Sequence, residues 1–336
     1  MKHNTLTDIA KKLKISPSTV SRALSDHRDI SKETKEKVRA LAEKLHYVPN
    51  PIAQSLKRNR TSTIGILVPE IKHDFFSSAI SGIEEIAYQN GYTIILNQSN
   101  ESYEREVVNT NTLMHYRVAG VIASISQNTR NGDHFKLLIE RNIPLVFFDR
   151  VCEDVEANKV VIDDENSAFK AVRHLIEKGY KKIAHFAGPR ELDICKKRLN
   201  GYKAALNCTN FDKQEEFILY GGLHEADGYK SMDILINRNI IPDAIFCVND
   251  PVAIGAFQRI KEAGLRIPKD IGIVGFSNNK ITSLVEPPIT TINQPSYEMG
   301  KRAAEILIDL IKNKNKAKKT ADTVVIETEL IIRGST

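Results

Sequence analysis

The stretch TLTDIAKKLKISPSTVSRAL, residues 5–24, decides how the N-terminal part of the chain folds. Its apolar residues recur at helical spacing in two short runs, and Thr5 and Ser16 stand where good N-caps would start each run. Pro17 fits the first helical position, where its missing N–H costs nothing. Two short helices separated by the tight turn LKIS predict a helix-turn-helix unit, completed by a third helix over about 31–45.

The second helix of this unit is expected to carry small hydroxyl groups and one arginine on its outer face. In a helix-turn-helix, the second helix lies in the DNA major groove. The outward residues are Ser18, Ser21, Arg22 and Ser25, whose hydroxyls suit phosphate contacts and whose guanidinium suits guanine. Such a face could instead pack against another protein, but that alternative leaves the surrounding lysines unexplained.

The excess of basic residues is confined to the same part of the chain. Residues 1–60 contain 14 Lys and Arg against 6 Asp and Glu, whereas the remainder contains 34 against 36. The overall net charge of +6 therefore combines a head of +8 with a body of −2. This asymmetry favours a nucleic-acid-binding head on a near-neutral body over a merely solvated basic surface.

Beyond residue 60, short β-rich apolar runs alternate with amphipathic helical stretches. The runs are TIGILVP, YTIILNQS, AGVIASI, PLVFFD, KKIAHFAG, AIFCVND and DIGIVGF, and helical stretches such as NSAFKAVRHLIEKG lie between them. Strands that are apolar on both faces are typical of parallel sheets, so this alternation predicts doubly wound α/β lobes. The length exceeds that of a usual single core, and we expect two lobes with a cleft between them.

Ligands of such sheets bind beyond the carboxyl ends of the strands. The residues that close or follow the strands, and that we expect around an effector, are Phe75, Phe76, Asp149, Arg150, Arg198, Asn249, Asp250 and Ser277. Their aromatic, carboxylate, amide and guanidinium groups together suit a polyhydroxylated ligand. Each also has a structural alternative: an aspartate can cap a helix, an Asp–Arg pair can be structural, and the phenylalanines can belong to the core.

Several functional classes lack their sequence signatures. The chain has no G-x-G-x-x-G, G-x-x-x-x-G-K-[ST], G-x-S-x-G or H-E-x-x-H, and its nine histidines never fall at metal-ligand spacing. We therefore expect no enzyme activity, no catalytic residues, no cofactor and no metal. The polar N-terminus, the lack of a long apolar run and the four scattered cysteines favour a cytoplasmic protein with reduced thiols and no membrane contact.

From end to end, the chain resembles the LacI/GalR family of bacterial transcription regulators. The resemblance rests on TLTDIAKKLKISPSTVSRAL, YVPNPIAQSL, IGILVP, HFAGP, RLNGY, FCVNDPVAIGA and IIRGST. The first two motifs together are highly specific, whereas the body motifs alone could also belong to a periplasmic sugar-binding protein.

The resemblance implies a homodimer whose paired heads bind a near-palindromic DNA operator. It implies a DNA-binding domain over 1–48, a hinge segment over 49–60, and an effector-binding and dimerisation domain over 61–336. The last domain is expected to have the two-lobed, type I periplasmic-binding-protein-like fold, with a small effector in its cleft. Because no leucine-heptad tail follows IIRGST, the tetramer of some relatives is not expected.

Matching positions imply particular DNA contacts. The residues expected to contact phosphates are Thr5, Ser16, Thr19, Ser21, Ser31 and Tyr47, and those expected near base edges are Ser18 and Arg22. The linker PNPIAQSLKRNR matches a hinge helix that enters the minor groove, through Asn50, Ala53 and Leu56. Pro17 stands where many relatives carry a base-contacting side chain, so readout is expected to rest more on Ser18 and Arg22. We expect Leu56 to wedge open a base step with Lys57 on a nearby phosphate, although Leu56 could instead attach the linker to the body.

Ser277 is the departure that bears on the effector, because the family usually has a ligand-binding aspartate at this position. A hydroxyl holds a sugar diol less firmly than a carboxylate, so a phosphorylated or acidic effector is an alternative.

We therefore expect a repressor of carbohydrate uptake or catabolic genes, controlled allosterically by a sugar or sugar derivative. Whether the effector releases DNA or promotes binding stays open. The rival interpretations are a soluble sugar-binding protein without a DNA role and an enzyme on a doubly wound body.

Overall fold

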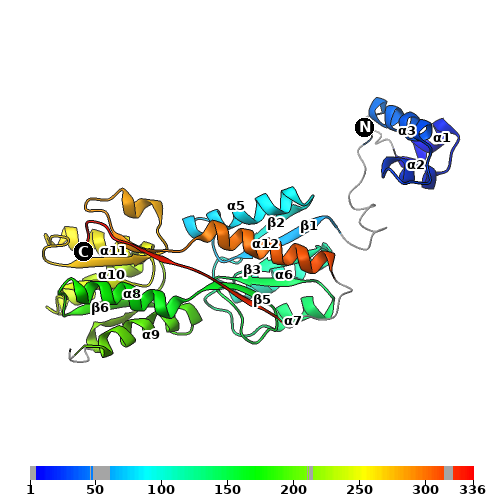
Figure 1. Cartoon of the computed structure of the whole chain (residues 1–336). Coiled ribbons are helices and arrows are strands. Elements are labelled where there is room, and N and C mark those ends of the chain that lie inside the picture. The colour runs from blue at the N-terminus through cyan, green and yellow to red at the C-terminus, as the bar shows by residue number, and fades with distance from the viewer. Residues whose placement is uncertain (1–4, 46, 48–60, 210, 212–214, 314–320) are drawn as a thin grey trace. The chain divides into compact units, whose positions relative to one another are not determined.

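The computed structural model describes residues 5–45, 47, 61–209, 211, 215–313 and 321–336 (Figure 1). Its contacts divide the chain into two compact units, Met1–Thr61 and Ser62–Thr336, which we call the head and the body. The predicted hinge residues Asn50, Ala53, Leu56 and Lys57 lie outside the described residues.

The head contains the predicted three-helix unit. Its helices are α1 (Leu6–Leu13), α2 (Pro17–Leu24) and α3 (Lys32–Lys44). A hydroxyl caps each one: Thr5 accepts a hydrogen bond from the Asp8 N–H, Ser16 from the Thr19 N–H and Ser31 from the Thr34 N–H. Since the first N–H groups of a helix have no partner inside it, these caps fix where each helix begins.

Small apolar side chains form the core of the head. The buried residues are Ile9, Ala10, Val20, Ala23, Val38 and Ala42, with larger side chains packed around them. Lys14 takes a left-handed conformation (φ 54°) after α1, which turns the chain sharply toward α2. The helical periodicity and the turn of the quoted motif therefore account for this unit.

The body has two α/β lobes, each built on a six-stranded sheet. The sheet of lobe 1 has the order β11-β5-β4-β3-β1-β2 and is parallel throughout. Lobe 2 has the order β12-β10-β9-β8-β6-β7, in which β12 runs antiparallel to β10. The predicted doubly wound parallel architecture is confirmed.

The strands of lobe 1 are β1 (Thr63–Val68), β2 (Thr93–Gln98), β3 (Gly120–Ala123), β4 (Leu145–Phe148), β5 (Asn158–Ile162) and β11 (Thr323–Ile326). Its helices are α5 (Asp74–Gln89), α6 (Tyr103–His115), α7 (Asp133–Glu140) and α12 (Ser296–Lys312).

The strands of lobe 2 are β6 (Ile183–Gly188), β7 (Ile218–Tyr220), β8 (Ala244–Cys247), β9 (Gly272–Phe276), β10 (Thr290–Asn293) and β12 (Glu329–Ile331). Its helices are α8 (Asp164–Glu177), α9 (Asp193–Asn207), α10 (Glu225–Asn237) and α11 (Asp250–Glu262), with short 3-10 turns at Glu215–Phe217 and Lys280–Ser283.

The chain passes between the lobes after β5, after β10 and after β11. The first crossing leads directly into α8, the second leads through Gln294 and Pro295 into α12, and the third joins β11 to β12 (Figure 1). Each lobe is therefore assembled from separate parts of the sequence, and the crossings lie beside the strand ends where a ligand was expected.

Helices α5 and α12 lie side by side in lobe 1 and approach each other through glycine (Figure 1). A Cβ on Gly82 would lie 2.2 Å from the Tyr297 carbonyl oxygen, and a Cβ on Gly300 would lie 2.0 Å from that of Ala79. Since real side chains do not approach backbone so closely, only glycine allows this packing. The close fit makes lobe 1 a rigid support for the residues at the start of α5.

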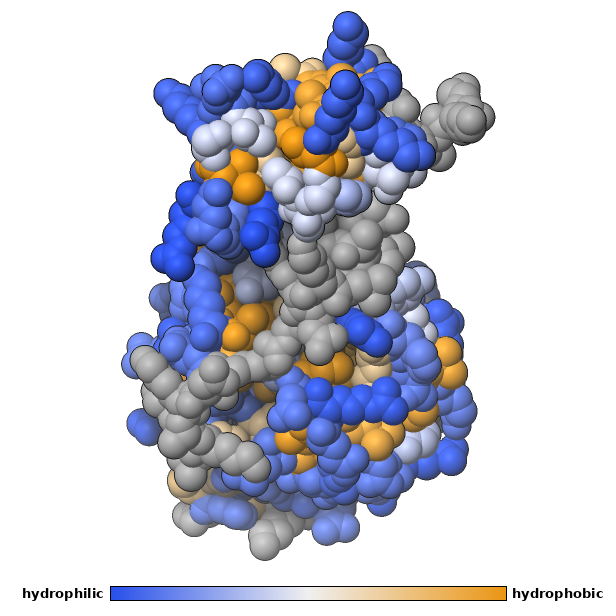
Figure 2. Space-filling model, turned by 90° about the vertical axis from the view of Figure 1, so that its right-hand side faces the viewer, coloured by the Kyte–Doolittle hydropathy of each residue, from blue (hydrophilic) through white to orange (hydrophobic). Residues whose placement is uncertain are grey.

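No helix in the described parts of the chain is long and apolar enough to cross a membrane. Large apolar side chains are instead gathered in interior clusters, three in the body and one in the head. On the face shown in Figure 2, apolar residues form separate patches within a mainly hydrophilic surface.

Candidate nucleic-acid interface and interlobe pocket

The N-terminus of α2 carries a cluster of hydroxyl groups. Ser16 Oγ lies 2.7 Å from Ser18 Oγ and 2.8 Å from Thr19 Oγ1, and it also accepts the Thr19 N–H at 3.0 Å. Ser16, Pro17 and Ser18 are exposed. A helix N-terminus with free donors is a natural site for an anion, so these groups can exchange their mutual bonds for a phosphate.

The cations of the head fall into two groups. On α3, Lys35 and Arg39 each lie 3.1 Å from Asp26, and Lys37 lies 2.7 Å from Glu33. Those contacts pair three of the five cations of α3, and Lys35 lowers the pKa of the exposed Asp26 carboxyl.

The cations on α1 and α2 are exposed and lack such partners. Arg22, Lys11, Lys12 and Lys14 have no acidic partner among the residues of the head that the structure describes. Because uncompensated charge attracts polyanions, these four cations make α1 and α2 a positive surface; on α3, only Lys32 and Lys44 have no acidic partner in the described head.

The remaining residues expected at DNA lie at the helix starts and next to the core. Thr5 and Ser31 are exposed N-caps, and Ser21 is half-buried on α2. Tyr47 packs against the core of the head, and burial raises the pKa of its hydroxyl. The exposed caps present hydroxyls at two further helix N-termini.

A narrow pocket lies between the lobes of the body. Its lining residues are His73, Phe75, Phe76, Glu101, Asp149, Arg150, Ile194, Arg198, Leu223, Asn249, Pro251, Ser277, Asn279 and Gln294. Seven of the eight residues expected around an effector are thus brought together, all except Asp250. The pocket encloses about 50 Å³, far below the roughly 300 Å³ of ordinary ligand sites, so its lining side chains leave little free space in this arrangement.

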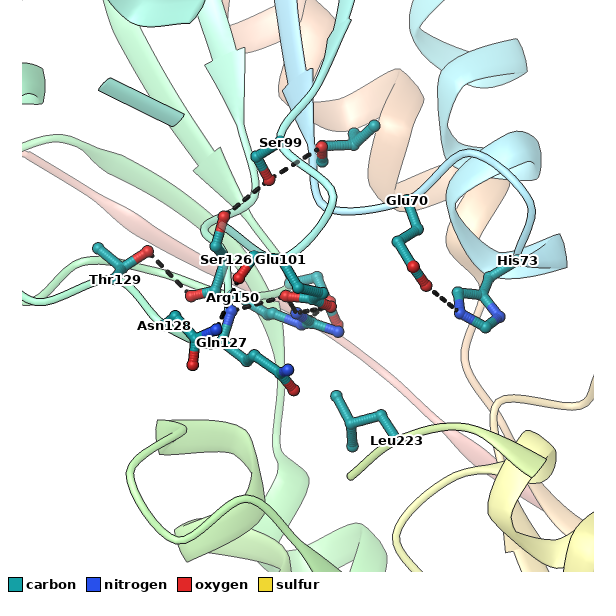
Figure 3. A network of polar contacts seen from close by, with 12 residues as sticks. Glu70, His73, Ser99, Glu101, Ser126, Gln127, Asn128, Thr129, Arg150 and Leu223 are labelled. Carbon is teal, nitrogen blue, oxygen red and sulfur yellow. Dashed lines mark hydrogen bonds and ion pairs between the residues drawn. The ribbon is translucent and has the colours of Figure 1, made fainter. Parts of the chain in front are cut away.

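Arg150 enters the pocket from lobe 1 and is already paired. Its Nη1 donates to both carboxylate oxygens of Glu101, at 2.8 and 3.0 Å (Figure 3). Its guanidinium lies 5.6 Å from the Phe76 ring centre. Glu101 also accepts the backbone N–H of Gln127 at 2.7 Å. Because both charges are buried, this pair depends on its mutual contact.

A chain of amide and hydroxyl contacts crosses between the lobes. Ser277 donates to the Gln294 side-chain oxygen at 2.9 Å, and the Gln294 amide donates to Asp149 at 3.3 Å. Burial raises the pKa of Asp149, although the neighbouring Arg150 opposes this shift. Asp149 and Ser277 have positive φ angles of 59° and 118°, a strained backbone that often marks functional sites.

Arg198 is the buried cation of lobe 2. Its Nε and Nη2 lie 2.8 and 2.7 Å from Asp164 Oδ1, its Nη1 donates to the Val248 carbonyl at 2.6 Å, and its guanidinium stacks 3.7 Å from the Phe276 ring centre. Burial raises the pKa of Asp164 to about 6 against the opposing charge of Arg198. Asp164 opens α8 next to the first crossing, so the pair ties the pocket to an interlobe connection.

Asn249 and Asp250 take structural bonds in lobe 2. Asn249 caps α11 by accepting the Val252 N–H at 2.9 Å, and its amide donates to the Leu223 carbonyl. Asp250 was expected around the effector, but it is not among the residues that line the pocket, and its fully buried carboxylate accepts from Thr291 and from the Asn279 N–H at 2.7 and 2.6 Å. It therefore holds the 277–280 loop, and burial raises its pKa to about 6.

Phe75 and Phe76 form the apolar wall of the pocket. Their rings meet edge to face at 5.2 Å, and Phe76 continues toward Phe148 in the core of lobe 1. The two phenylalanines therefore belong to the core and also line the pocket, as the two alternatives from the sequence had it.

A larger, more open hollow of about 650 Å³ adjoins the pocket and shares Phe75, Ser277, Asn279 and Gln294 with it. The rest of it is lined by the first half of α5, by the start of α12 and by Asn278, Lys280 and Asn293 of lobe 2. Because the hollow lacks both buried arginines, we place the candidate effector site in the narrower pocket, where the convergent charged groups are.

Sequence reasoning missed three partners of the predicted residues, namely Glu101, Asp164 and Gln294. Glu101 follows the strand run YTIILNQS, so extending the strand-end argument to that strand would have found it. Asp164 and Gln294 lie at crossings, which no local pattern distinguishes from ordinary loops.

Known proteins match both units. The family model described as bacterial regulatory proteins, lacI family, matches residues 5–50, and the periplasmic binding protein-like domain matches 172–336. The chain is 35% identical over 317 residues to the HTH-type transcriptional repressor PurR of Vibrio atlanticus (strain LGP32), covering 94% of each chain. It is 35% identical over 333 residues to the HTH-type transcriptional repressor CytR of Escherichia coli (strain K12), covering 99% of this chain and 96% of the other.

A solved structure gives the same picture for the fold. The Lac repressor dimer bound to operator and the anti-inducer ONPF superposes with a TM-score of 0.87 at 26% identity, covering 99% of each chain. The likeness therefore spans the head and the body.

Proposed function

The chain belongs to the lacI family of bacterial regulatory proteins, and from this premise we propose that it is a transcriptional repressor that binds operator DNA as a homodimer. A small effector in the interlobe pocket sets its affinity for DNA. The observation that carries the proposal is the outer face of α2, where an exposed arginine without an acidic partner in the described head adjoins a cluster of hydroxyls. A surface of this kind fits the bases and phosphates of a major groove.

In this proposal, the hydroxyls at the helix starts hold phosphates and α2 reads bases. Ser16, Thr19, Ser21, Thr5, Ser31 and Tyr47 contact the DNA backbone, and Ser18 and Arg22 reach base edges beside Pro17. Asn50, Ala53, Leu56 and Lys57 act at the minor groove. Among these groups, the hydroxyls of Ser16, Ser18 and Thr19 bond to one another and Arg22 is exposed, so they are available to DNA.

The pocket favours a neutral, hydroxyl-rich effector over an acidic one. Arg150 and Arg198 already face Glu101 and Asp164, so a carboxylate or phosphate would have to displace a buried carboxylate. Hydroxyls can instead insert between these groups, because each hydroxyl both donates and accepts. We therefore retain a sugar or sugar derivative as the effector, and control of carbohydrate genes as the role.

The test of DNA binding begins with selection from randomised duplexes by the full-length protein. We expect an enriched near-palindrome whose binding weakens steeply with salt, with a log-log slope of about −0.9 for each phosphate neutralised. Failure to enrich any sequence, or a flat salt response, would contradict a repressor.

The effector is tested by thermal unfolding in the presence of sugars and sugar phosphates. A ligand at about 100 times its dissociation constant stabilises the protein by roughly 2.7 kcal/mol, which a melting curve resolves. The same compound must change the affinity for the selected duplex. Stabilisation only by phosphorylated compounds would show that the effector is acidic and not neutral.

A further inference from the structure

Two histidines and one glutamate meet at the rim of the interlobe pocket. Glu70 and His73 lie between β1 and α5 in lobe 1, whereas His224 stands immediately before α10 in lobe 2. Figure 3 shows Glu70 and His73 across the pocket from Leu223, the residue before His224. Residues far apart in the sequence thus form one cluster that spans the two lobes.

The donor atoms of this cluster converge on a single carboxylate oxygen. His73 Nε2 lies 2.7 Å and His224 Nδ1 lies 3.8 Å from Glu70 Oε2, and the two imidazole rings stack with centroids 5.5 Å apart. One ligand atom from each of the three residues lies within 4.8 Å of the other two. Lys72 approaches the other carboxylate oxygen, at 3.5 Å, and leaves Oε2 to the histidines.

One of these donors has no hydrogen-bond partner. His224 Nδ1 is shielded from solvent and is unpaired, while the His224 backbone N–H donates to Asp227 at 3.0 Å. The His224 imidazole stands at the N-cap of α10 but makes no side-chain hydrogen bond there. A buried polar atom without a partner requires an explanation, and a metal ion is one that also uses the other two side chains.

We propose that Glu70, His73 and His224 bind a divalent transition metal of the zinc type that bridges the two lobes. Two imidazoles and a carboxylate form a donor set that zinc accepts, with a fourth position left for water. Zinc–ligand distances of about 2.1 Å in a tetrahedron separate neighbouring ligand atoms by about 3.4 Å. The distances of 2.7 and 3.8 Å from the two histidines to Glu70 Oε2 lie on either side of this value, so each would change by less than about 1 Å on metal binding.

The metal would hold the two lobes together at the rim of the pocket. His73 and Leu223 line the pocket, so a bridge between His73 and His224 fixes two sides of its rim. By linkage, metal and effector must change each other's affinity by the same factor. The site stands independently of DNA binding, because metal affinity is measured without DNA.

The test is calorimetric titration of Zn²⁺ into the full-length protein after removal of metal by a chelator. We expect one Zn²⁺ per chain, and Co²⁺ in its place should give the intense visible bands of a four-coordinate site. His224→Gln and Glu70→Gln should each weaken Zn²⁺ binding at least tenfold, since even changes behind a ligand cost about 10- to 100-fold. His115→Gln, which removes an exposed histidine of α6, should leave it unchanged.

Two outcomes would overturn the proposal. Wild-type protein could bind no Zn²⁺ at micromolar concentration, or both cluster variants could bind it as tightly as wild type while remaining folded by circular dichroism.

Discussion

The head and the interlobe pocket use similar polar side chains in opposite ways. On α2, Arg22 is exposed and the hydroxyl of Ser16 bonds only to neighbours on its own helix. In the pocket, Arg150 and Arg198 are buried and each already has a carboxylate partner. The difference teaches that the polar groups of α2 can bind an external partner without losing buried contacts. A ligand in the pocket must instead replace contacts that Arg150 and Arg198 already make with protein carboxylates.

The two regions should therefore respond differently to mutation. Removing a polar group from the pocket leaves its partner buried and unpaired, which costs stability. Removing one from α2 leaves nothing buried, so the cost should appear only when DNA is bound. The predictions below test this contrast.

The largest effect is expected for Arg198→Met. The substitution leaves the buried Asp164 carboxylate without its cation, and loss of one partner of a buried pair costs about 3–5 kcal/mol. Urea unfolding of the body measures it, and adding Asp164→Asn should recover part of the loss. A cost below about 1 kcal/mol, the usual limit for surface pairs, would mean that pocket and head pairs are alike.

Asp250→Asn should change the pH dependence of stability. Burial raises the pKa of Asp250 from 3.8 to about 6, so the folded state binds this proton more tightly than the unfolded state. The stability that this proton contributes is present below about pH 4 and is lost as pH rises through about 6.

The measurement is the difference in unfolding free energy between wild type and Asp250→Asn, followed from pH 4 to 7. At about 1.4 kcal/mol for each pKa unit, the wild type should lose roughly 3 kcal/mol relative to the variant. Burial lowers the pKa of His185 to about 4, which acts in the opposite direction, but this contribution is common to both proteins and cancels. A constant difference would show that Asp250 is charged throughout.

Arg22→Ala should weaken operator binding by about 1–3 kcal/mol, the range for one arginine–guanine contact, and relax sequence preference at one base pair. The unfolding free energy of the head should stay unchanged, because Arg22 is exposed. Fluorescence anisotropy with the selected duplex and its single-base variants measures the effect. Arg238→Ala, an exposed position on the body, is the matched control.

The smallest effect is expected for Thr5→Ala, which removes the hydroxyl that caps α1. Loss of such a cap costs about 1 kcal/mol in the stability of the head. Thr7→Ala, at an exposed position inside the same helix, should cost less. Thermal unfolding followed by circular dichroism compares them, and equal losses would show that the cap does not set the start of the helix.

The parts of the fold that could be predicted from the sequence are those held by interactions between residues close together in the chain. The three helices of the head depend on caps and on spacings of three or four residues, so the quoted motif contained the information for the first two, and the local pattern over about 31–45 contained it for the third. The lobes followed from the alternation of apolar runs, and seven pocket residues followed from the rule on strand ends.

The partners of those residues could not be predicted in the same way. Arg150 meets Glu101, and Arg198 meets Asp164, only after distant strands and helices have packed together. Asp250 lies outside the pocket lining for a related reason, because the Thr291 hydroxyl and the Asn279 N–H satisfy its buried carboxylate. The meeting of His73 and His224 is longer in range still, since it requires both lobes.

The three crossings make the pocket part of the joint between the lobes. Asp164, beside the first crossing, binds Arg198, and Gln294, on the second, joins Ser277 to Asp149. A molecule that inserts here replaces contacts at the interlobe connections themselves. A small rotation about these connections moves the far edges of two rigid lobes by a larger distance, so even a small effector can change the positions of those edges.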